Sequence, residues 1–430
     1  MDRLLKASRQ RADPAHHSAL PIRSKILWTE ALLRSSMSGG PSTPPSPSAT
    51  APVDRLTPRH MYDSYCELLL PFASSPELLE QYTNASGGIR TGMLMEHLDS
   101  LAGGIAYKHM LGPGVTALEK ELGFYIVTAS VDRLDMLADL YPPVRDMRLS
   151  GQVIHTGRSS MEIAVRMEAL EKDGTEETIM LGRFCMVCRD GRTHKAAPVN
   201  PLIMSAPEDQ MLFNIGEMHR KRRQTQAVRA LTRMPPTSEE AEALHSLHLT
   251  YGQHETWKDY ATSDAVERVW MGDTHLEKCM MMFPQERNVH QKIFGGYLMR
   301  LAYELGFTNA SLFTRGHVRF LSLDGIAFTR PVPIGSILRL TSHVLHTSSS
   351  EQYPAIVHVG VQANVVDTAT GAEQTTNDFR FTWCSDEGAP PLTRKVVPKT
   401  YKEAMLWLEG KRALDMGAEI RGMRKASGRI

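Results

Sequence analysis

Residues 91–110 read TGMLMEHLDSLAGGIAYKHM, and residues 295–313 read GGYLMRLAYELGFTNASLF. In both stretches apolar side chains recur at the three- and four-residue spacing of a helix, and further apolar residues fill the flanks of that stripe. A helix that is apolar around most of its circumference is buried on most of its sides. The two stretches therefore predict two long, buried helices.

Each of these helices is followed by segments that alternate apolar and polar residues, as β-strands with one buried face do. They cover residues 127–136, 149–170 and 177–190 after the first helix, and 318–328, 338–350, 355–367 and 375–383 after the second. The order is the same both times, which indicates an internal repeat. One central helix wrapped by an antiparallel sheet is the hot-dog arrangement, so the sequence predicts an α+β chain of two tandem hot-dog domains.

Length and composition agree with two domains and exclude several classes of protein. A chain of 430 residues suits two cores plus extensions. The 49 basic residues nearly cancel the 48 acidic ones, so the chain lacks the positive field of a nucleic-acid-binding protein. No apolar run reaches the length of a membrane helix, which argues against stable membrane insertion. Five scattered cysteines predict neither a disulfide framework nor a metal site.

The chain outside the two repeats divides into extensions and a connector. Several arginines, lysines and serines in the first 36 or so residues are typical of a mitochondrial presequence, and the Ser/Pro-rich stretch 35–52 predicts a disordered linker. The basic run 220–223 is interpreted as a solvated helix face rather than a phosphate site. We predict a presequence and linker over residues 1–54 and an N-terminal hot dog, beginning near Arg55, over residues 55–192. A connector over 193–262 leads to a C-terminal hot dog over 263–388. A terminal helix with a tail follows over 389–430.

Asp99 is the residue of the first helix that most needs an explanation. It follows Leu98 and lies two turns into an apolar helix, where a carboxylate is costly. Its neighbour Glu96 lies in the first turn, where the helix dipole favours an acid, and we assign it no catalytic role. A partly buried carboxylate such as Asp99 can act as a general base or a nucleophile.

The second helix is preceded by a polar loop, PQERNVHQKIFGG, over residues 284–296. Gly295 and Gly296 allow the backbone to approach a ligand closely, and N–H groups at a helix start can stabilise an oxyanion. Asn288 and His290 stand in the loop and can orient a water molecule or a carbonyl group by hydrogen bonds. Asp99, Asn288, Gly295 and Gly296 are therefore the candidate catalytic residues.

Several motifs, in the same order along the chain, resemble the hot-dog acyl-coenzyme A thioesterase family. They are R-x-G-x-L-M-E-x-L-D-S-L from Arg90, HTGRSSMEI from His155, APVNPL from Ala197, the PQERN and IFGG loop followed by YELG, and PKTYKEAMLWLEGKR from Pro398. The resemblance covers about residues 61–412 and is nearest to a mitochondrial branch of the family. It implies a mitochondrial matrix enzyme that hydrolyses fatty acyl-coenzyme A without a cofactor.

The resemblance also implies how the site is built. Two hot dogs form an intramolecular pseudo-dimer, in which Asp99 of one half and Asn288 of the other act on the thioester. The N–H groups of Gly295 and Gly296 would receive the thioester oxygen. Whether Asp99 activates water or attacks the carbonyl itself stays open. Related enzymes often assemble as trimers of double hot dogs, so we expect a homo-oligomer.

Coenzyme A carries phosphates, and the related segment of the family lies along the coenzyme A cleft. We therefore assign Arg158, Ser159 and Ser160 to substrate binding, together with His290. An ordinary turn at a strand start explains the same three residues equally well. The matching histidines His155 and His346 are interpreted as structural.

The equivalent position in the second half predicts a single working site. Counted from Gly92 and Gly296, Asp99 corresponds to Tyr303, and a tyrosine is a poor base at neutral pH. A second site would have to use Asn84 and Glu304. Two other functions are compatible with the sequence: a hot-dog dehydratase of 3-hydroxyacyl thioesters, with His97 or His290 as its catalytic histidine, and a non-catalytic acyl-coenzyme A binding protein.

Overall fold

In a computed structural model of the chain, each half forms one long helix wrapped by antiparallel strands. The first half has α4 (Thr91–Leu111) with β2 (Cys66–Leu70), β3 (Phe124–Val131), β4 (Leu134–Met136), β5 (Asp146–Thr156), β6 (Ser160–Leu170) and β7 (Glu176–Asp190). The second has α7 (Gly295–Thr314) with β10 (Leu276–Met281), β11 (Arg319–Leu323), β12 (Ile326–Ala327), β13 (Ile337–Ser348), β14 (Ile356–Val366) and β15 (Glu373–Cys384). The predicted pair of hot dogs is confirmed.

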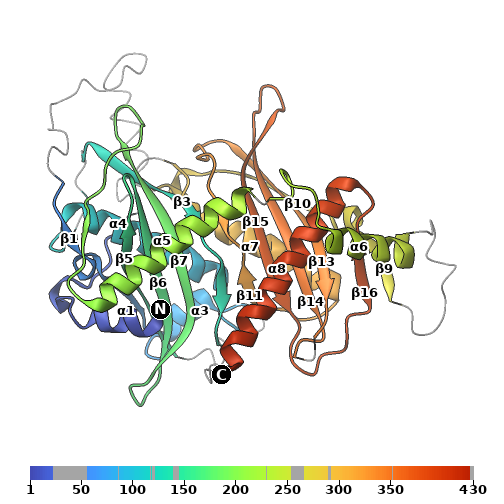
Figure 1. Ribbon diagram of the computed structural model, residues 1–430, viewed down its shortest axis with the longest axis horizontal. Coiled ribbons are helices and arrows are strands. Elements are labelled where there is room, and N and C mark those ends of the chain that lie inside the picture. The colour runs from blue at the N-terminus through green and yellow to red at the C-terminus, as the bar shows by residue number, and fades with distance from the viewer. Residues whose placement is uncertain are drawn as a thin grey trace.

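The structure describes residues 1–22, 56–85, 87–116, 118, 122–138, 145–228, 230–252, 266–288, 292–350 and 352–426. Over these residues the strands of both halves form one 12-stranded sheet, with β10 and β2 at its edges. The halves meet where β11 pairs with β4 and β12 pairs with β3. Figure 1 labels β11 and β3, which lie between the two halves. Because this seam joins the two sheets directly, elements of one half lie within reach of the other.

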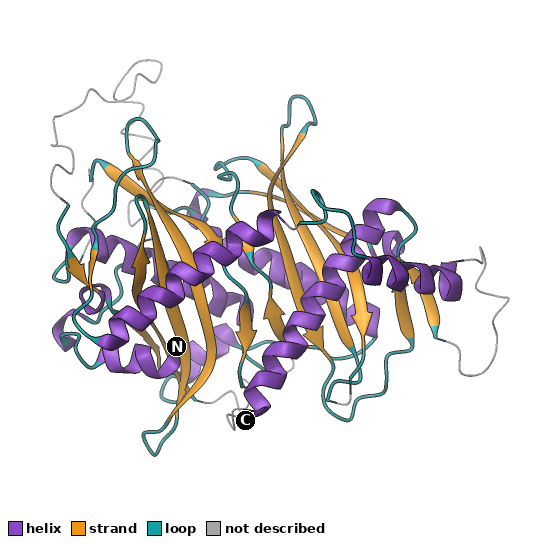
Figure 2. Ribbon diagram, in the orientation of Figure 1, coloured by secondary structure: helices purple, strands orange, loops and turns teal. Residues whose placement is uncertain are grey.

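Helices cover both faces of the sheet. The central helices α4 and α7 pack on one face and contact each other, whereas α5 (Pro207–Val228) and α8 (Tyr401–Ala426) cross the opposite face (Figure 2). Glycines on these outer helices allow close contact with the two matching histidines. A Cβ on Gly216 would lie 2.5 Å from His155 Cβ, and one on Gly410 would lie 2.6 Å from His346 Cβ. Both histidines are thus packing residues, as the sequence indicates.

The apolar character of α4 explains its position. Seventeen of its 21 residues are buried, which matches the prediction of a helix covered on most sides. The helix ends at Gly112, whose φ of 113° is a conformation that side chains with a Cβ rarely adopt. Three charged residues, Glu96, Asp99 and Lys108, are buried within it, and each has a polar partner.

The first 22 residues fold against the N-terminal hot dog. Helix α1 (Asp2–Arg9) packs on α5, and Arg11 forms an ion pair with the buried Asp209. Further along, Leu20 lies against α4, where a Cβ on Gly104 would be only 2.9 Å from Leu20 O. Our expectation that the folded part begins near Arg55 is therefore wrong for residues 1–22. The predicted Ser/Pro linker lies outside the described residues.

The connector between the halves includes α5, α6 (Ser238–Leu247) and the short strand β8 (Leu202–Ile203), which pairs with β1 (Arg59–His60). The basic run on α5 is only partly a solvated face. Arg223 donates hydrogen bonds to Asp132, at 2.7 Å, and to the buried Glu162. The interpretation of this run as solvated is thus wrong for Arg223, which anchors α5 to the sheet. After the second hot dog, β16 (Arg394–Val397) pairs with β9 (Glu267–Trp270) and leads into α8.

Candidate active site

Asp99 lies where the two central helices meet. Its carboxylate is 1% exposed and accepts two hydrogen bonds, one per oxygen. Thr128 Oγ1 on β3 donates to Oδ1 at 2.8 Å, and the backbone N–H of Gly296 on α7 donates to Oδ2 at 2.7 Å. The predicted neighbourhood of Asp99 and the glycine pair therefore exists, and it spans both halves of the chain.

The bond from Gly296 makes Asp99 a cap of the opposite helix. The first N–H groups of an α-helix have no partner within the helix, and a carboxylate at that end is favoured by the helix dipole. Phe294, at the N-cap of α7, supplies no side-chain hydrogen bond. Asp99, on α4, is instead the side chain that accepts a hydrogen bond from the start of α7. The expectation that both glycine N–H groups await the thioester oxygen is therefore wrong for Gly296, whose N–H is already bound to Asp99.

Glycine is required at the helix start because the helices approach closely. A Cβ on Gly296 would lie 2.9 Å from both Cα and the carbonyl oxygen of Glu96, which is backbone that cannot move aside cheaply. A Cβ on Gly295 would lie 3.2 Å from Asp99 Oδ2 and 3.1 Å from the Phe328 ring. The structure thus shows a close approach of the two glycines to α4, and the expected close approach to a ligand stays a prediction.

Burial raises the pKa of Asp99 to about 6, and the hydrogen bonds from Thr128 and Gly296 oppose this shift because they stabilise the charged form. A carboxyl group with this pKa is ionised at the pH of most compartments, yet it is more basic than an exposed aspartate. Such a group is suited to accept a proton from water.

Glu96, to which we assign no role, also holds the helices together. It is 3% exposed and forms an ion pair of 2.9 Å with Arg300 on α7. The interpretation that helix-dipole stabilisation alone explains Glu96 is wrong, because a buried carboxylate needs a charged partner. Thr128 was also missed, since the alternating pattern of β3 does not indicate which hydroxyl meets the helix.

The equivalent position in the second half holds aromatic rings instead of a carboxylate. Tyr303 is packed against Phe320 and Trp383, with ring centroids 5.6 Å and 4.7 Å away, and burial raises its pKa above the usual value of a tyrosine. Glu304 points elsewhere, forming an ion pair of 3.1 Å with Arg90, and Asn84 Oδ1 accepts a hydrogen bond from Gly88 N–H.

Asn288 lies in the loop ahead of α7. Its N–H donates to Lys292 O at 2.8 Å, and its Oδ1 accepts from Lys292 N–H at 3.2 Å, so the loop folds back on itself before the helix begins. Its catalytic role stays a prediction. His290 lies outside the described residues.

Arg158, Ser159 and Ser160 form the turn between β5 and β6. The carbonyl groups of this turn accept hydrogen bonds from Val199, at 3.1 Å, and Cys188, at 2.9 Å. Across the sheet, Ser160 pairs with Val187, which pairs with Val127 beside Thr128. The turn is thus two strand spacings, roughly 10 Å, from β3, the strand whose Thr128 donates a hydrogen bond to Asp99. The side chain of Arg158 is exposed, whereas Asp99 is buried.

A scan against protein-family models matches none, but similar proteins exist. The chain is 37% identical over 360 residues to mitochondrial acyl-coenzyme A thioesterase 9 of Homo sapiens, which aligns over 84% of this chain and 79% of that protein. It is 31% identical over 375 residues to the chloroplastic acyl-coenzyme A thioesterase 2 of Humulus lupulus, over 84% and 83% of the two chains. A solved acyl-coenzyme A hydrolase of Staphylococcus aureus, in complex with butyryl-coenzyme A and coenzyme A, is 24% identical and covers 37% of this chain and 94% of its own, with a TM-score of 0.32.

Two central helices wrapped by one antiparallel sheet, together with the two thioesterase relatives above 30% identity, define the class of protein, a thioester hydrolase with the hot-dog fold. More particularly, the chain belongs to the acyl-coenzyme A thioesterase family, and it is similar there to the mitochondrial members 9 and 10. These members confirm the predicted mitochondrial location. No helix in the described part of the chain is long and apolar enough to cross a membrane. Within the same residues, no group of three or more His, Cys, Asp or Glu could hold a metal ion.

The pKa of Asp99 predicts the pH dependence of the reaction. In its predicted role of base or nucleophile, Asp99 acts only when ionised, so kcat/KM should fall below an apparent pKa of about 6 and be level above it. Thr128→Val removes a hydrogen bond that stabilises the charged form of Asp99, so the pKa of Asp99 should rise. The fall of kcat/KM on the acidic side of the profile should then move to higher pH by about one unit. Thr308→Val, on the exposed face of α7, is the control and should leave the acidic side of the pH profile unchanged. A profile that is flat from pH 5 to 8 would remove Asp99 from the rate-limiting chemistry.

Proposed function

We propose that the chain hydrolyses fatty acyl-coenzyme A to a free fatty acid and coenzyme A at one site, built from Asp99 and the start of α7. The observation that carries this proposal is the buried Asp99 carboxylate, bonded to the N-terminus of the opposite central helix. Membership of the acyl-coenzyme A thioesterase family supplies the substrate class.

In this proposal the thioester carbonyl lies beside the first turn of α7. The N–H of Gly296 holds Asp99, so the adjacent N–H of Gly295 is the donor for the carbonyl oxygen, which becomes negative in the tetrahedral intermediate. Thr128 and Gly296 fix the orientation of the carboxylate, and this reduces the entropy lost in the transition state.

Two courses of reaction fit this arrangement. As a base, Asp99 takes a proton from a water molecule held by Asn288 while the water oxygen attacks the carbonyl carbon. As a nucleophile, Asp99 attacks the carbon itself and forms an anhydride that water then hydrolyses. In both, the C–S bond breaks, the sulfur leaves as the thiolate of coenzyme A, and one water molecule is consumed. Neither course needs a cofactor.

The turn at Arg158, Ser159 and Ser160 is proposed to bind the phosphates of coenzyme A, with His290 as a further contact. A guanidinium and two hydroxyls are suitable phosphate ligands. The pantetheine arm separates the thioester from the phosphates, so a phosphate site displaced from Asp99 is what this substrate requires. We also propose a homo-oligomer of double hot dogs.

One feature of the site weighs against the dehydratase. His97, one of its two candidate histidines, is two residues from Asp99 on the same helix, and residues so spaced do not face each other. The other candidate, His290, lies outside the described residues. Its Nε2 lies 2.5 Å from Tyr82 Oη, on α3 (Pro76–Tyr82). Purified protein given an acyl-coenzyme A and a thiol reagent separates the three functions: free thiol marks hydrolysis, an enoyl product marks dehydration, and binding without turnover marks a non-catalytic protein.

Asp99→Ala is expected to lower kcat by at least about 10²-fold in this assay, because it removes the base or nucleophile. Asp273→Ala, which removes an exposed aspartate of the second half, is the matched control and should keep normal turnover. Circular dichroism should show both variants folded. Near-normal turnover of folded Asp99→Ala would refute the proposed site.

Arg158→Ala is expected mainly to raise KM for acyl-coenzyme A, with kcat changed little, because the phosphates are remote from the reacting carbon. The control is Arg192→Ala, which removes an exposed arginine from the turn after β7. An unchanged KM for Arg158→Ala, or an equal rise in both variants, would show that the phosphates bind elsewhere.

A further inference from the structure

Four aromatic side chains pack together between α7 and the sheet in the second half. Tyr303 and Phe307 lie on α7, Phe320 lies on β11 and Trp383 lies on β15. The ring centroid of Trp383 is 4.7 Å from that of Tyr303, 5.5 Å from that of Phe307 and 5.6 Å from that of Phe320. Trp383 is fully buried, so this cluster is a closed apolar core.

The corresponding positions on α4 carry an acid and a glycine. Asp99 corresponds to Tyr303. Gly103, four residues further along α4, corresponds to Phe307, four residues further along α7. Residues four apart share one face of a helix, with their Cβ positions about 5–6 Å from each other. Gly103 therefore lies on the same face of α4 as the Asp99 carboxylate, one turn beyond it.

The strands differ between the halves in the same way. Thr128 of β3 is paired with Met186 of β7. In the second half, Phe320 of β11 is paired with Trp383 of β15. These pairs correspond, because Thr128 contacts Asp99 and Phe320 contacts the tyrosine at the equivalent position. A hydroxyl and a thioether thus replace two rings. Because methionine has three rotatable bonds and adapts its shape to its neighbours, this region can admit an apolar chain.

Ile22, from the N-terminal segment, takes part of the room that the missing rings leave. A Cβ on Gly103 would lie 2.6 Å from Ile22 Cδ1, so the isoleucine occupies the position that a side chain of α4 would otherwise have. Ile22 is 6% exposed and belongs to the main apolar core, as Met186 does. An apolar side chain from outside the hot dog thus closes this face of α4 one turn beyond Asp99.

Hydrogen bonds on two sides hold the N-terminal segment in this place. The backbone N–H of Glu67, on the edge strand β2, donates to His17 O at 2.7 Å. Lys108 of α4 is buried, and its Nζ donates to His16 O and, at 3.1 Å, to Tyr65 O. The segment that carries Ile22 is therefore attached both to the sheet edge and to α4.

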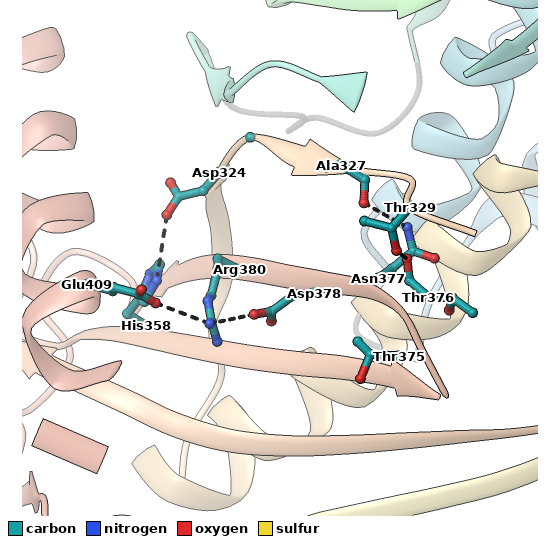
Figure 3. Close-up of a pocket in the computed structure, with 11 residues that line it drawn as sticks. Asp324, Ala327, Thr329, His358, Thr375, Thr376, Asn377, Asp378, Arg380 and Glu409 are labelled. Atoms are coloured by element: carbon teal, nitrogen blue, oxygen red, sulfur yellow. Dashed lines mark hydrogen bonds and ion pairs between the residues drawn. The ribbon is translucent and has the colours of Figure 1, made fainter. Parts of the chain in front are cut away.

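The cavity of about 420 Å³ beneath α8 is unsuited to an acyl chain. It lies on the sheet face opposite the central helices, and its wall carries Asp324, Asp378, Arg380 and Glu409 (Figure 3). Methylene groups gain from burial among apolar neighbours, whereas these charged side chains would lose contact with water. The inner face of the sheet, beside Asp99, is the better place for the acyl chain.

We propose that Ile22 forms the end of the acyl pocket and makes the enzyme selective for short acyl chains. This inference rests on the proposed function, which puts the thioester carbonyl at Asp99 and the start of α7. From there the acyl chain extends along α4, against Met186, and meets Ile22 after about one helical turn, roughly 5–6 Å. A chain of a few carbons fits this distance, whereas a long chain collides with Ile22.

The test is isothermal titration of the full-length protein with S-alkyl-coenzyme A thioethers, which cannot be hydrolysed. In the unsubstituted protein, affinity should rise from the ethyl to the butyl thioether and rise no further to the octyl thioether, because an added methylene gains affinity only where it is buried. Ile22→Ala opens the end of the pocket, so the affinity for the octyl thioether relative to the butyl thioether should rise at least about tenfold.

A second variant keeps the test open if Ile22→Ala does not fold. Ile22→Val removes only the Cδ1 methyl group, the atom nearest to Gly103, and such a substitution is mild in a core. It should raise the affinity for the octyl thioether relative to the butyl thioether at least about threefold.

Leu20→Ala is the matched control, because Leu20 belongs to the same segment and is 4% exposed. Leu20 packs on Gly104, whose counterpart on α7, Thr308, is exposed, so Leu20 lies on a different face of α4 from Asp99. The relative affinity for the octyl thioether should therefore stay within about twofold of normal in this variant.

Four results would overturn the proposal. They are no binding of any thioether, affinity that still rises from butyl to octyl in the unsubstituted protein, an unchanged relative affinity in the Ile22 variants, and an equal rise in Leu20→Ala. The proposed hydrolysis is tested separately, by thiol release from butyryl-coenzyme A. Binding with the expected profile but without thiol release would refute hydrolysis and still support Ile22 as the end of the pocket.

Discussion

The close approach of α4 and α7 is the constraint on which the rest of the structure depends. Where the helices cross, the N–H groups at the start of α7 need an acceptor, and the buried Asp99 carboxylate needs donors. One hydrogen bond of 2.7 Å, from the Gly296 N–H to Asp99, serves both groups. This bond forms only because position 296 has no side chain to collide with Glu96. The nearby pair of Glu96 and Arg300 then joins the same two helices through charge. The contact that joins the two helices is thus also the contact on which the proposed chemistry depends.

The two similar halves differ at the residues where their central helices cross, and this difference supports the proposal of a single site. Where the first half has Asp99, the second has Tyr303, which packs into a cluster of aromatic rings. The second half has thereby gained an apolar core at a position that is polar in the first. The two halves also differ on the outer face of the sheet. In the first half Arg223 forms ion pairs with Asp132 and Glu162, whereas the second half has a cavity beneath α8. The two halves of the repeat thus differ both where the central helices cross and on the outer face of the sheet.

The sequence was enough to predict both central helices, the alternating strands and Asp99, because each has a local signal. The helices and strands show apolar periodicity, and Asp99 is an acid at a position where an acid is costly. Thr128 and the pairing of Glu96 with Arg300 depend on which strand and helix come together in space, and no local pattern encodes this. The first 22 residues were misjudged for a related reason. Their basic composition resembles a targeting segment, whereas the partner of Arg11 is Asp209, nearly two hundred residues away.

The most direct test of the account compares Gly296→Ala with Gly92→Ala, which alter equivalent positions in the two halves. The added methyl group meets the backbone of Glu96 at 2.9 Å in the first variant, and the side chain of Tyr303 at 3.1 Å in the second. Turnover of an acyl-coenzyme A should fall at least about 10²-fold in Gly296→Ala, because the helix start is displaced from Asp99, and stay within about threefold of normal in Gly92→Ala. Equal effects of the two substitutions, with both proteins folded, would contradict a single site at the start of α7.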